Sequence, residues 1–238
     1  MSYFQGFVIP VKDGRKDDYL AMATKAAPVF AEYGAVQVVE CWEESVPDGK
    51  LTDLRRAVNA EAGEKIVYSW IWWPDKATCD GAAEKLMADK RMQPDGDLPF
   101  DAQRMIYAGF EAVHDSGANG GFGYVDAVVG PAAGSRDGFA GSAAKIDGFF
   151  LREGAIRTVD GWGADVPDGK VTDFKRAVAA EDGETVIFGW IEWPDKATRD
   201  KAFATVMADP EMQQLQPGFD MKRAIFGGFT PILDSDNQ

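Results

Sequence analysis

The chain has 238 residues, of which 45% are hydrophobic and 27% are charged, and its formal net charge is -14. This composition is typical of a globular protein with one large or two smaller domains, and it argues against an intrinsically disordered chain. Because the phosphates of nucleic acids and of anionic membrane surfaces repel so acidic a protein, we expect neither as a partner.

The predicted elements of the first half follow one another in the order β-α-β-β-α-β. They are, in chain order, a strand at 5–11, a helix at 15–33, strands at 35–42 and 65–73, a helix that begins after Pro74, and a strand at 104–113. Apolar stripes at helical spacing indicate the helices, and runs rich in β-branched and aromatic residues indicate the strands. This order is the ferredoxin-like arrangement, in which the helices cover one face of an antiparallel sheet.

The same pattern occurs a second time in the chain. VPDGKLTDLRRAV at 46–58 returns as VPDGKVTDFKRAV at 166–178, and WPDKAT at 73–78 returns at 193–198. Between the two copies, HDSGANGGFG at 114–123 is rich in glycine, which predicts a flexible tether.

The repeat predicts two ferredoxin-like modules, at 1–113 and 124–238, joined by a linker at 114–123. In each module one face of the sheet lacks helices, so the other module is expected to cover it. The predicted fold class is therefore α+β, with the two modules fused as a pseudo-dimeric α/β barrel around a pseudo-twofold axis. The sequence does not indicate whether fused chains associate further.

Several of these segments resemble a known family. GFVIPV, VVECW, VPDGK, WPDKAT, MADKRM and RMIYAGFE are similar to the YbaA-like family of uncharacterised bacterial proteins, a domain of unknown function in the dimeric α/β-barrel superfamily. Members of that family are usually single modules of about half this length. The second copy departs from the pattern in YVDAVVGPAAGSRDGFAG. The resemblance implies the fold and no activity, because the family has none to carry over.

The N-terminal segment and the cysteines favour a cytoplasmic location. MSYFQGFVIPVKDG lacks the basic region and long apolar run of a secretory signal, and YSWIWWP is too short to span a bilayer. The cysteines, Cys41 and Cys79, have Gly161 and Arg199 as their counterparts in the second copy, so no framework of disulfides is indicated.

Acidic and basic side chains recur on the predicted strands. Because strand side chains alternate, Glu40 and Trp42 share one face, as Asp160 and Trp162 do in the second copy. We expect this face to line the barrel together with Arg104 and its counterpart Arg223 on the last strands. A carboxylate and a guanidinium in an aromatic cavity could orient a polar small molecule. Alternatively, the two charges pair with each other as a structural salt bridge.

The repeated loop and the aromatic residues each have two interpretations. Asp53 and Arg56, with Arg176 in the second copy, belong either to a loop that closes over a pocket or to a turn and helix cap. Tyr68 becomes Phe188 in the second copy, which indicates either one working pocket in the first half or neutral drift. The candidate ligand-binding residues are therefore Glu40, Trp42, Asp53, Arg56, Tyr68, Trp70, Arg104, Asp160, Trp162, Arg176 and Arg223.

No cofactor or metal ion is expected. His114 is the only histidine, and the chain has no Cys/His cluster, no P-loop and no dinucleotide-binding motif in a suitable context. The leading functional hypothesis is a protein that binds a small polar or aromatic molecule in a cavity of the fused pseudo-dimer. The alternatives are a cofactor-independent enzyme of the monooxygenase or isomerase type and an assembly protein with a filled barrel. The sequence identifies no catalytic residue and does not decide whether the protein is an enzyme.

Overall fold

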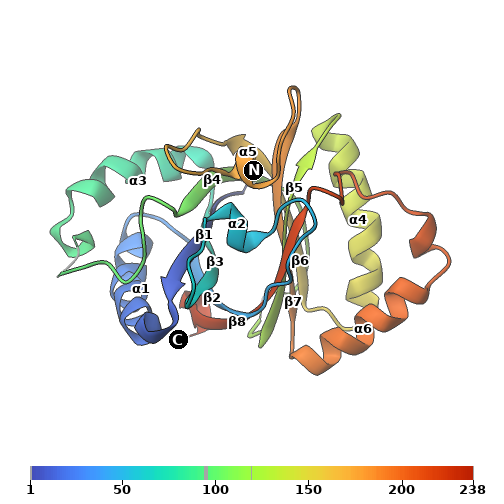
Figure 1. Cartoon of the computed structure of the whole chain (residues 1–238), viewed down its shortest axis with the longest axis horizontal. Helices are drawn as coiled ribbons and strands as arrows, with labels where there is room; N and C mark the ends of the chain where they lie inside the picture. The colour runs from blue at the N-terminus through green and yellow to red at the C-terminus, as the bar shows by residue number, and fades with distance from the viewer. Residues whose placement is uncertain (1, 94–95, 119, 238) are drawn as a thin grey trace.

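The computed structural model describes residues 2–93, 96–118 and 120–237, which form an α+β fold built on a closed antiparallel barrel of eight strands (Figure 1). The elements of the first half are β1 (Tyr3–Lys12), α1 (Lys16–Glu32), β2 (Gln37–Ser45), α2 (Leu54–Ala57), β3 (Glu64–Trp73), α3 (Lys76–Ala88) and β4 (Ile106–Gly117). Those of the second half are β5 (Tyr124–Ala132), α4 (Arg136–Arg152), β6 (Arg157–Asp165), α5 (Phe174–Ala177), β7 (Thr185–Trp193), α6 (Lys196–Ala208) and β8 (Ile225–Asp234). The long elements follow the predicted β-α-β-β-α-β order in both halves.

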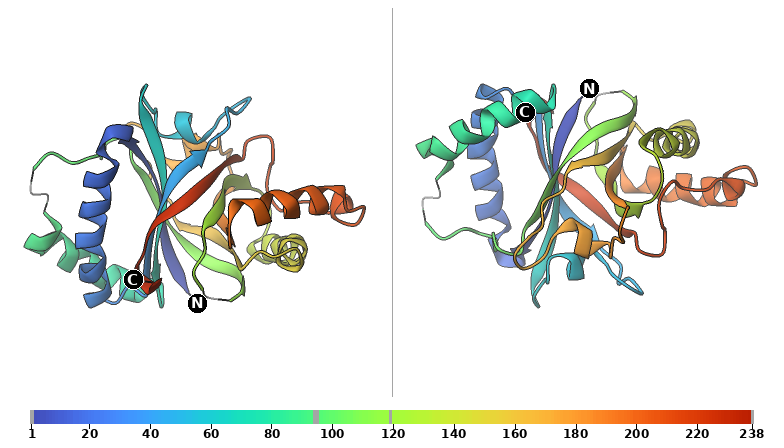
Figure 2. Two further views of the ribbon diagram at one scale, coloured as in Figure 1. Left: turned by 90° about the horizontal axis from the view of Figure 1, so that it is seen from below. Right: turned by 90° about the horizontal axis from the view of Figure 1, so that it is seen from above.

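The strands of each half are neighbours in the barrel. Around the barrel their order is β1-β3-β2-β8-β5-β7-β6-β4, so β2 pairs with β8 and β4 pairs with β6 where the halves meet. Helices α1 and α3 lie outside the strands of the first half, and α4 and α6 lie outside those of the second (Figure 2). Each sheet is therefore covered by its own helices on one face and by the opposite half on the other.

Aromatic side chains from both halves fill the barrel. Trp70 stacks on Trp190 with ring centroids 4.2 Å apart, and Tyr68 stacks on Phe188 at 4.3 Å. In each pair the two residues occupy equivalent positions of the repeat, so they meet near the pseudo-twofold axis. Trp70 and Trp190 are therefore packing residues of a core that the two halves share.

A difference between the copies at Cys41 and Gly161 follows from this packing. A Cβ atom on Gly161 would lie 2.3 Å from the Phe4 ring, which leaves no room for any side chain. The counterpart of Phe4 on β5 is the smaller Val125, which pairs at the equivalent strand position. Large and small residues are thus exchanged between the halves, and the interior stays filled.

The segment between the copies is shorter than predicted. Strand β4 continues to Gly117 and pairs with β6, so the first four residues of the expected tether at 114–123 are strand. Residue 119 lies outside the described residues. Phe122 is partly buried, and its ring stacks on Trp70 with centroids 6.2 Å apart, so this end of the connection contributes to the core.

Within the described part of the chain, no helix is both long enough and apolar enough to cross a membrane.

Candidate functional site

The two repeated loops are hydrogen-bonded to each other. Asp53 caps α2 by accepting a hydrogen bond from the Arg56 backbone N–H at 2.8 Å, which confirms the predicted helix cap. Thr52 donates from its hydroxyl to the Ala177 carbonyl, and Thr172 donates to the Ala57 carbonyl, both at 2.6 Å. These reciprocal bonds give the repeated stretch a structural role in joining the halves.

The two loop arginines brace their own loops. The guanidinium of Arg56 donates to the Gly49 carbonyl at 2.9 Å, and that of Arg176 donates to the Gly169 carbonyl at the same distance. Both side chains are also exposed on the surface and lie near the capping aspartate of their loop. These contacts favour the interpretation as turn and cap over a loop that closes a pocket.

The predicted placement of Glu40 and Trp42 inside the barrel is wrong. Alternation on β2 puts them on one face as expected, but that face packs under α1, while Val39 and Cys41 point into the barrel. Glu40 accepts a hydrogen bond from the Tyr19 hydroxyl at 2.6 Å. Burial raises the pKa of Glu40 to about 7, although the hydrogen bond from Tyr19 acts in the opposite direction. A buried acid with a tyrosine partner is thus present in the sheet–helix layer.

Asp160 and Trp162 also face a helix, which here is α4. Trp162 packs against Phe139, the counterpart of Tyr19, so Asp160 lacks a tyrosine partner. Asp160 is instead hydrogen-bonded to Asp147 of α4, whose Oδ2 lies 3.3 Å from His114 Nε2. Burial first, and then the negative charge of Asp147, raise the pKa of Asp160 well above its usual range. The second half therefore holds a carboxyl pair where the first has a single carboxyl group.

Arg104 and Arg223 do not lie on a barrel-facing strand. Each precedes the last strand of its half and forms a bidentate ion pair, Arg104 with Glu64 at 2.7 and 2.8 Å and Arg223 with Glu184 at 2.6 and 2.7 Å. Each arginine thus forms a salt bridge, but the alternative in which it pairs with Glu40 or Asp160 is wrong.

Two barrel residues with polar groups are fully buried in the core. The Tyr68 hydroxyl donates to the Gly189 carbonyl at 2.9 Å, so it ties β3 to β7 across the barrel. The Trp70 indole N–H is buried and has no hydrogen-bond partner among the described residues. Neither side chain reaches a surface from which a ligand could approach.

A surface pocket of about 500 Å³ lies outside the barrel, beside the N-terminal end of α1. Its walls are the end of β1 with Lys12, the following turn with Arg15, the turn with Glu61 before β3, and the segment 98–104. Arg104 and its ion pair with Glu64 form part of this lining, so one predicted residue does reach a pocket.

The pocket lies next to the buried Tyr19–Glu40 pair. Phe100 belongs to the pocket lining, and its ring meets that of Tyr19 edge to face with centroids 6.1 Å apart. Tyr19 in turn binds Glu40. Phe100 therefore separates the pocket from the acid, and the three side chains form a continuous layer from the surface to the sheet.

The second half differs at the residues that make this pocket polar. The strand pairing aligns Pro10 with Pro131, so the counterparts of Lys12 and Arg15 are Ala133 and Ser135, in a stretch one residue shorter. Sequence reasoning missed four residues of this pocket, namely Lys12, Arg15, Glu61 and Phe100. A comparison of VKDGR at 11–15 with AAGS at 132–135 could have revealed the two basic residues, because the second copy has no charged residue in this stretch.

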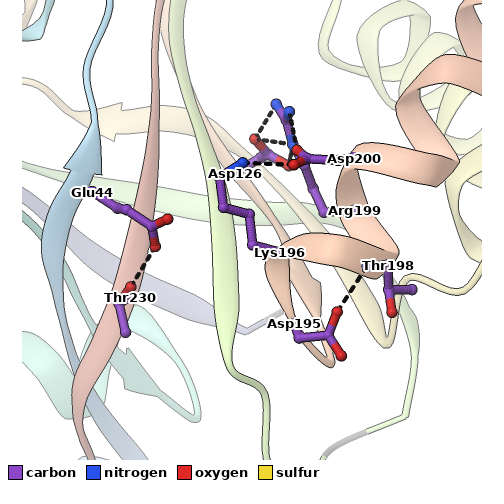
Figure 3. A network of polar contacts seen from close by, with 8 residues as sticks. All are labelled: Glu44, Asp126, Asp195, Lys196, Thr198, Arg199, Asp200 and Thr230. Carbon is purple, nitrogen blue, oxygen red and sulfur yellow. Dashed lines mark hydrogen bonds and ion pairs between the residues drawn. The ribbon is translucent and has the colours of Figure 1, made fainter.

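The second half has its own additional polar contacts. Arg199 of α6 binds Asp126 of β5 with nitrogen–oxygen distances of 2.7 to 2.9 Å, as Figure 3 shows. In the first half Cys79 and Gln5 stand at these positions, and Gln5 accepts from the Trp73 indole as Asp126 does from Trp193. The second half thus has a charged pair, Asp126 and Arg199, where the first half has the neutral residues Gln5 and Cys79. Both positions lie outside the pocket.

Metal ligation has no obvious place in the structure. Among the residues that the structure describes, no group of three or more histidine, cysteine, aspartate or glutamate side chains could hold a metal ion. The acidic side chains in and around the pocket are engaged with arginines or stand singly.

Solved structures with the same fold are distant in sequence. An anthrone oxidase-like protein matches with a TM-score of 0.56 and 12% identity, over 98% of this chain and 92% of the other. A proposed monooxygenase of Lactobacillus acidophilus NCFM matches with a TM-score of 0.56 and 10% identity, over 98% of this chain and 95% of the other. At these identities the likeness shows a shared dimeric α/β-barrel-like fold alone.

Sequence relatives are much closer. The uncharacterised protein YbaA of Escherichia coli K12 is 53% identical over 116 residues, which are 48% of this chain and 99% of the relative. The same values hold for YbaA of Shigella flexneri. The family model described as "protein of unknown function (DUF1428)" matches residues 2–102 and again residues 123–222. The chain therefore belongs to this family of proteins of unknown function and carries two segments that match its model.

Proposed function

We propose that the protein binds a small polar molecule in the pocket of its first half, and that the chain is a fused pair of ferredoxin-like modules of which one has kept this site. The observation that carries the proposal is the pocket itself, which has a volume of about 500 Å³. This volume lies in the range of ordinary small-molecule sites. Because aromatic side chains fill the barrel, the expected cavity inside the pseudo-dimer is absent among the described residues, and the proposed site lies outside the barrel.

The lining of the pocket combines polar and apolar groups in the way that ligand sites do. Lys12 is exposed at its rim and forms no ion pair with any residue that the structure describes. Leu98, Pro99 and Phe100 provide the apolar part of the lining. A few charged groups on an apolar surface fix the orientation of a ligand and give it specificity.

The asymmetry of the two halves supports one site per chain. The basic residues Lys12 and Arg15 have alanine and serine as counterparts, and the tyrosine below the pocket has Phe139. The first half also holds the continuous layer from Phe100 to Glu40. A fused chain can keep a site in one half while the other half retains only its packing role.

Native mass spectrometry and ligand-induced thermal shifts test this proposal. We expect one small molecule per chain, and we expect the double substitution Lys12→Ala, Arg15→Ser to weaken its binding by about fivefold or more. That double variant copies residues of the second half, which folds with them, so it should remain stable. Lys201→Ala on the outer face of α6 is the control for loss of a positive charge. Unchanged affinity in the double variant, or a stoichiometry of two, would contradict the proposal.

A cofactor-independent enzyme of the monooxygenase or isomerase type is the second candidate. The observation that favours it is the Tyr19–Glu40 pair behind the pocket, because a buried carboxyl with a pKa of about 7 is suited to proton transfer near neutral pH. Once a ligand is identified, Glu40→Gln should keep its binding and abolish its turnover. Unchanged ligand in incubations with the unsubstituted protein would leave binding as the function.

A further inference from the structure

The charged groups around the pocket differ in whether they already have partners. Arg104 is bound by Glu64 and Asp101, and the Arg15 guanidinium is bound by Asp18. Lys12 and Glu61 are exposed, and neither side chain forms an ion pair or a hydrogen bond with a residue that the structure describes. The pocket therefore presents one positive and one negative group that the protein itself does not neutralise.

These two groups are held close to one another by the backbone. Lys12 ends β1 opposite Glu64 of β3, and Glu61 is fixed in the preceding turn because its N–H donates to Glu64 Oε2 at 2.7 Å. Asp13, next to Lys12, donates from its N–H to the Gly63 carbonyl at 3.0 Å. The ends of these two segments are thus tied together, while the ammonium and the carboxylate remain too far apart for a salt bridge.

Another part of the lining is apolar, and the bridge between Val11 and Phe100 places it beside Lys12. Leu98, Pro99 and Phe100 make it up, and Phe100 is held against the buried ring of Tyr19. An apolar part of a ligand would gain free energy by covering these side chains. A ligand matched to the whole lining thus has an anionic group, a cationic group and an apolar portion.

We propose, on the basis of the small-molecule function above, that the ligand is a zwitterion of the amino-acid class. Its carboxylate binds Lys12, its ammonium group binds Glu61, and its apolar side chain lies on Leu98 and Phe100. The second half cannot make the same site, since Ala133 replaces the lysine and the carboxylate of Glu181 lies 3.8 Å from Arg223.

Matched probes separate the two charges. Calorimetry would compare three apolar L-amino acids (leucine, methionine and phenylalanine) with two analogues of each. One analogue is the amine that lacks the carboxylate, and the other is the carboxylic acid that has hydrogen in place of the amino group. We expect at least one amino acid to bind about fivefold more tightly than both of its analogues, as one partly exposed ion pair at each end would give.

Single substitutions assign each end of the ligand. Lys12→Ala should reduce the affinity for the amino acid to that for its amine, and Glu61→Gln should reduce it to that for its acid. Glu181→Gln, at the equivalent position of the second half, is the control and should change neither affinity. The side chains of Lys12 and Glu61 are exposed, so neither substitution is expected to unfold the protein.

The outcomes distinguish the two proposals. If an acid binds as tightly as its amino acid, or if no amino acid binds, the zwitterion proposal is wrong. A small-molecule adduct in native mass spectrometry that is lost in the Lys12→Ala, Arg15→Ser variant would then still support a ligand site. If that adduct is also missing and no probe binds, both proposals fall.

Discussion

At the scale of single residues, two tryptophans in the barrel differ in their hydrogen bonds. Trp190 Nε1 donates to Glu192 Oε1 at 2.9 Å, whereas Trp70 Nε1 is buried without a partner among the described residues. The cause is position 72, where the first half has tryptophan instead of the glutamate. A buried donor that has lost its acceptor is destabilising in a way that a paired donor is not.

Replacing each tryptophan with phenylalanine separates these cases. Both changes remove a similar volume from the same stack, but only Trp190→Phe breaks a hydrogen bond. We expect Trp190→Phe to lower the free energy of unfolding by about 1–3 kcal/mol more than Trp70→Phe. Urea denaturation would measure the difference. Equal losses would mean that the indole of Trp70 has an acceptor after all.

The buried Glu40 makes stability depend on pH. Its pKa is raised to about 7 by burial, above the value near 4.5 expected in the unfolded chain. The folded protein therefore holds a proton that the unfolded chain releases, so this stabilisation is complete below about pH 4.5 and is lost as the pH rises through 7.

Glu40→Gln removes that titration. The variant and the parent protein should have similar stability at pH 4.5, and the variant should be more stable at pH 8, by on the order of 3 kcal/mol. Thermal denaturation across this range checks the trend. A constant difference between the two proteins at all pH values would show that Glu40 titrates normally.

The sequence predicts which side chains share a face, but it does not predict what covers that face. Strand alternation correctly groups Glu40 with Trp42, yet both faces of this strand are buried and apolar enough to face either layer. Tyr19 on α1 decides the orientation, because its hydroxyl bonds Glu40. Similarly, the pairing of Arg104 with Glu64 depends on the barrel register, which no local pattern reveals.

At the scale of elements, the two repeated loops join the halves through a reciprocal pair of hydrogen bonds. Thr52→Val and Thr172→Val keep the shape of the side chain but leave the buried Ala177 or Ala57 carbonyl without its donor. Each should lower the free energy of unfolding by about 1–2 kcal/mol. Chemical denaturation measures this loss, with the exposed Leu51→Ala as the control, for which we expect a change within about 0.5 kcal/mol. A threonine variant as stable as the control would mean that the loops do not join the halves.

Element order and type were predictable, whereas the ends of elements were less so. The strand at 104–113 is found at Ile106–Gly117, because bulges in its pairing with β6 allow it to continue into the glycine-rich stretch. The pocket could be predicted only in part. Its basic residues differ between the copies, but the segment 98–104 is brought next to them by long-range contacts such as the bridge between Val11 and Phe100, which no local pattern predicts.

At the scale of the whole molecule, each half presents two strands that the other half completes. In an isolated first half, residues 1–118, β2 would keep β3 and β4 would keep β1, but each would have one unpaired edge. In the intact chain β2 pairs with β8, the counterpart of β4, so two copies of the first half could close the same barrel. Because the Phe4 ring leaves no room for a side chain at the position of Gly161, we expect sedimentation or light scattering to give this dimer for residues 1–118 carrying Cys41→Gly. A stable monomer would contradict the division into two fused modules.

Near the pseudo-twofold axis, a single chain is free of a constraint that applies to every homodimer. In a homodimer, any new charge close to the axis appears twice and faces its own copy. Here Arg157 lies between the counterparts Trp72 and Glu192, with its guanidinium 4.9 Å from the indole centroid and 3.9 Å from the carboxylate. Two glutamates would crowd like charges around each arginine, whereas one glutamate and one tryptophan give a cation a carboxylate on one side and an aromatic face on the other. The chain thus combines a repeated backbone arrangement with chemical asymmetry in its interior.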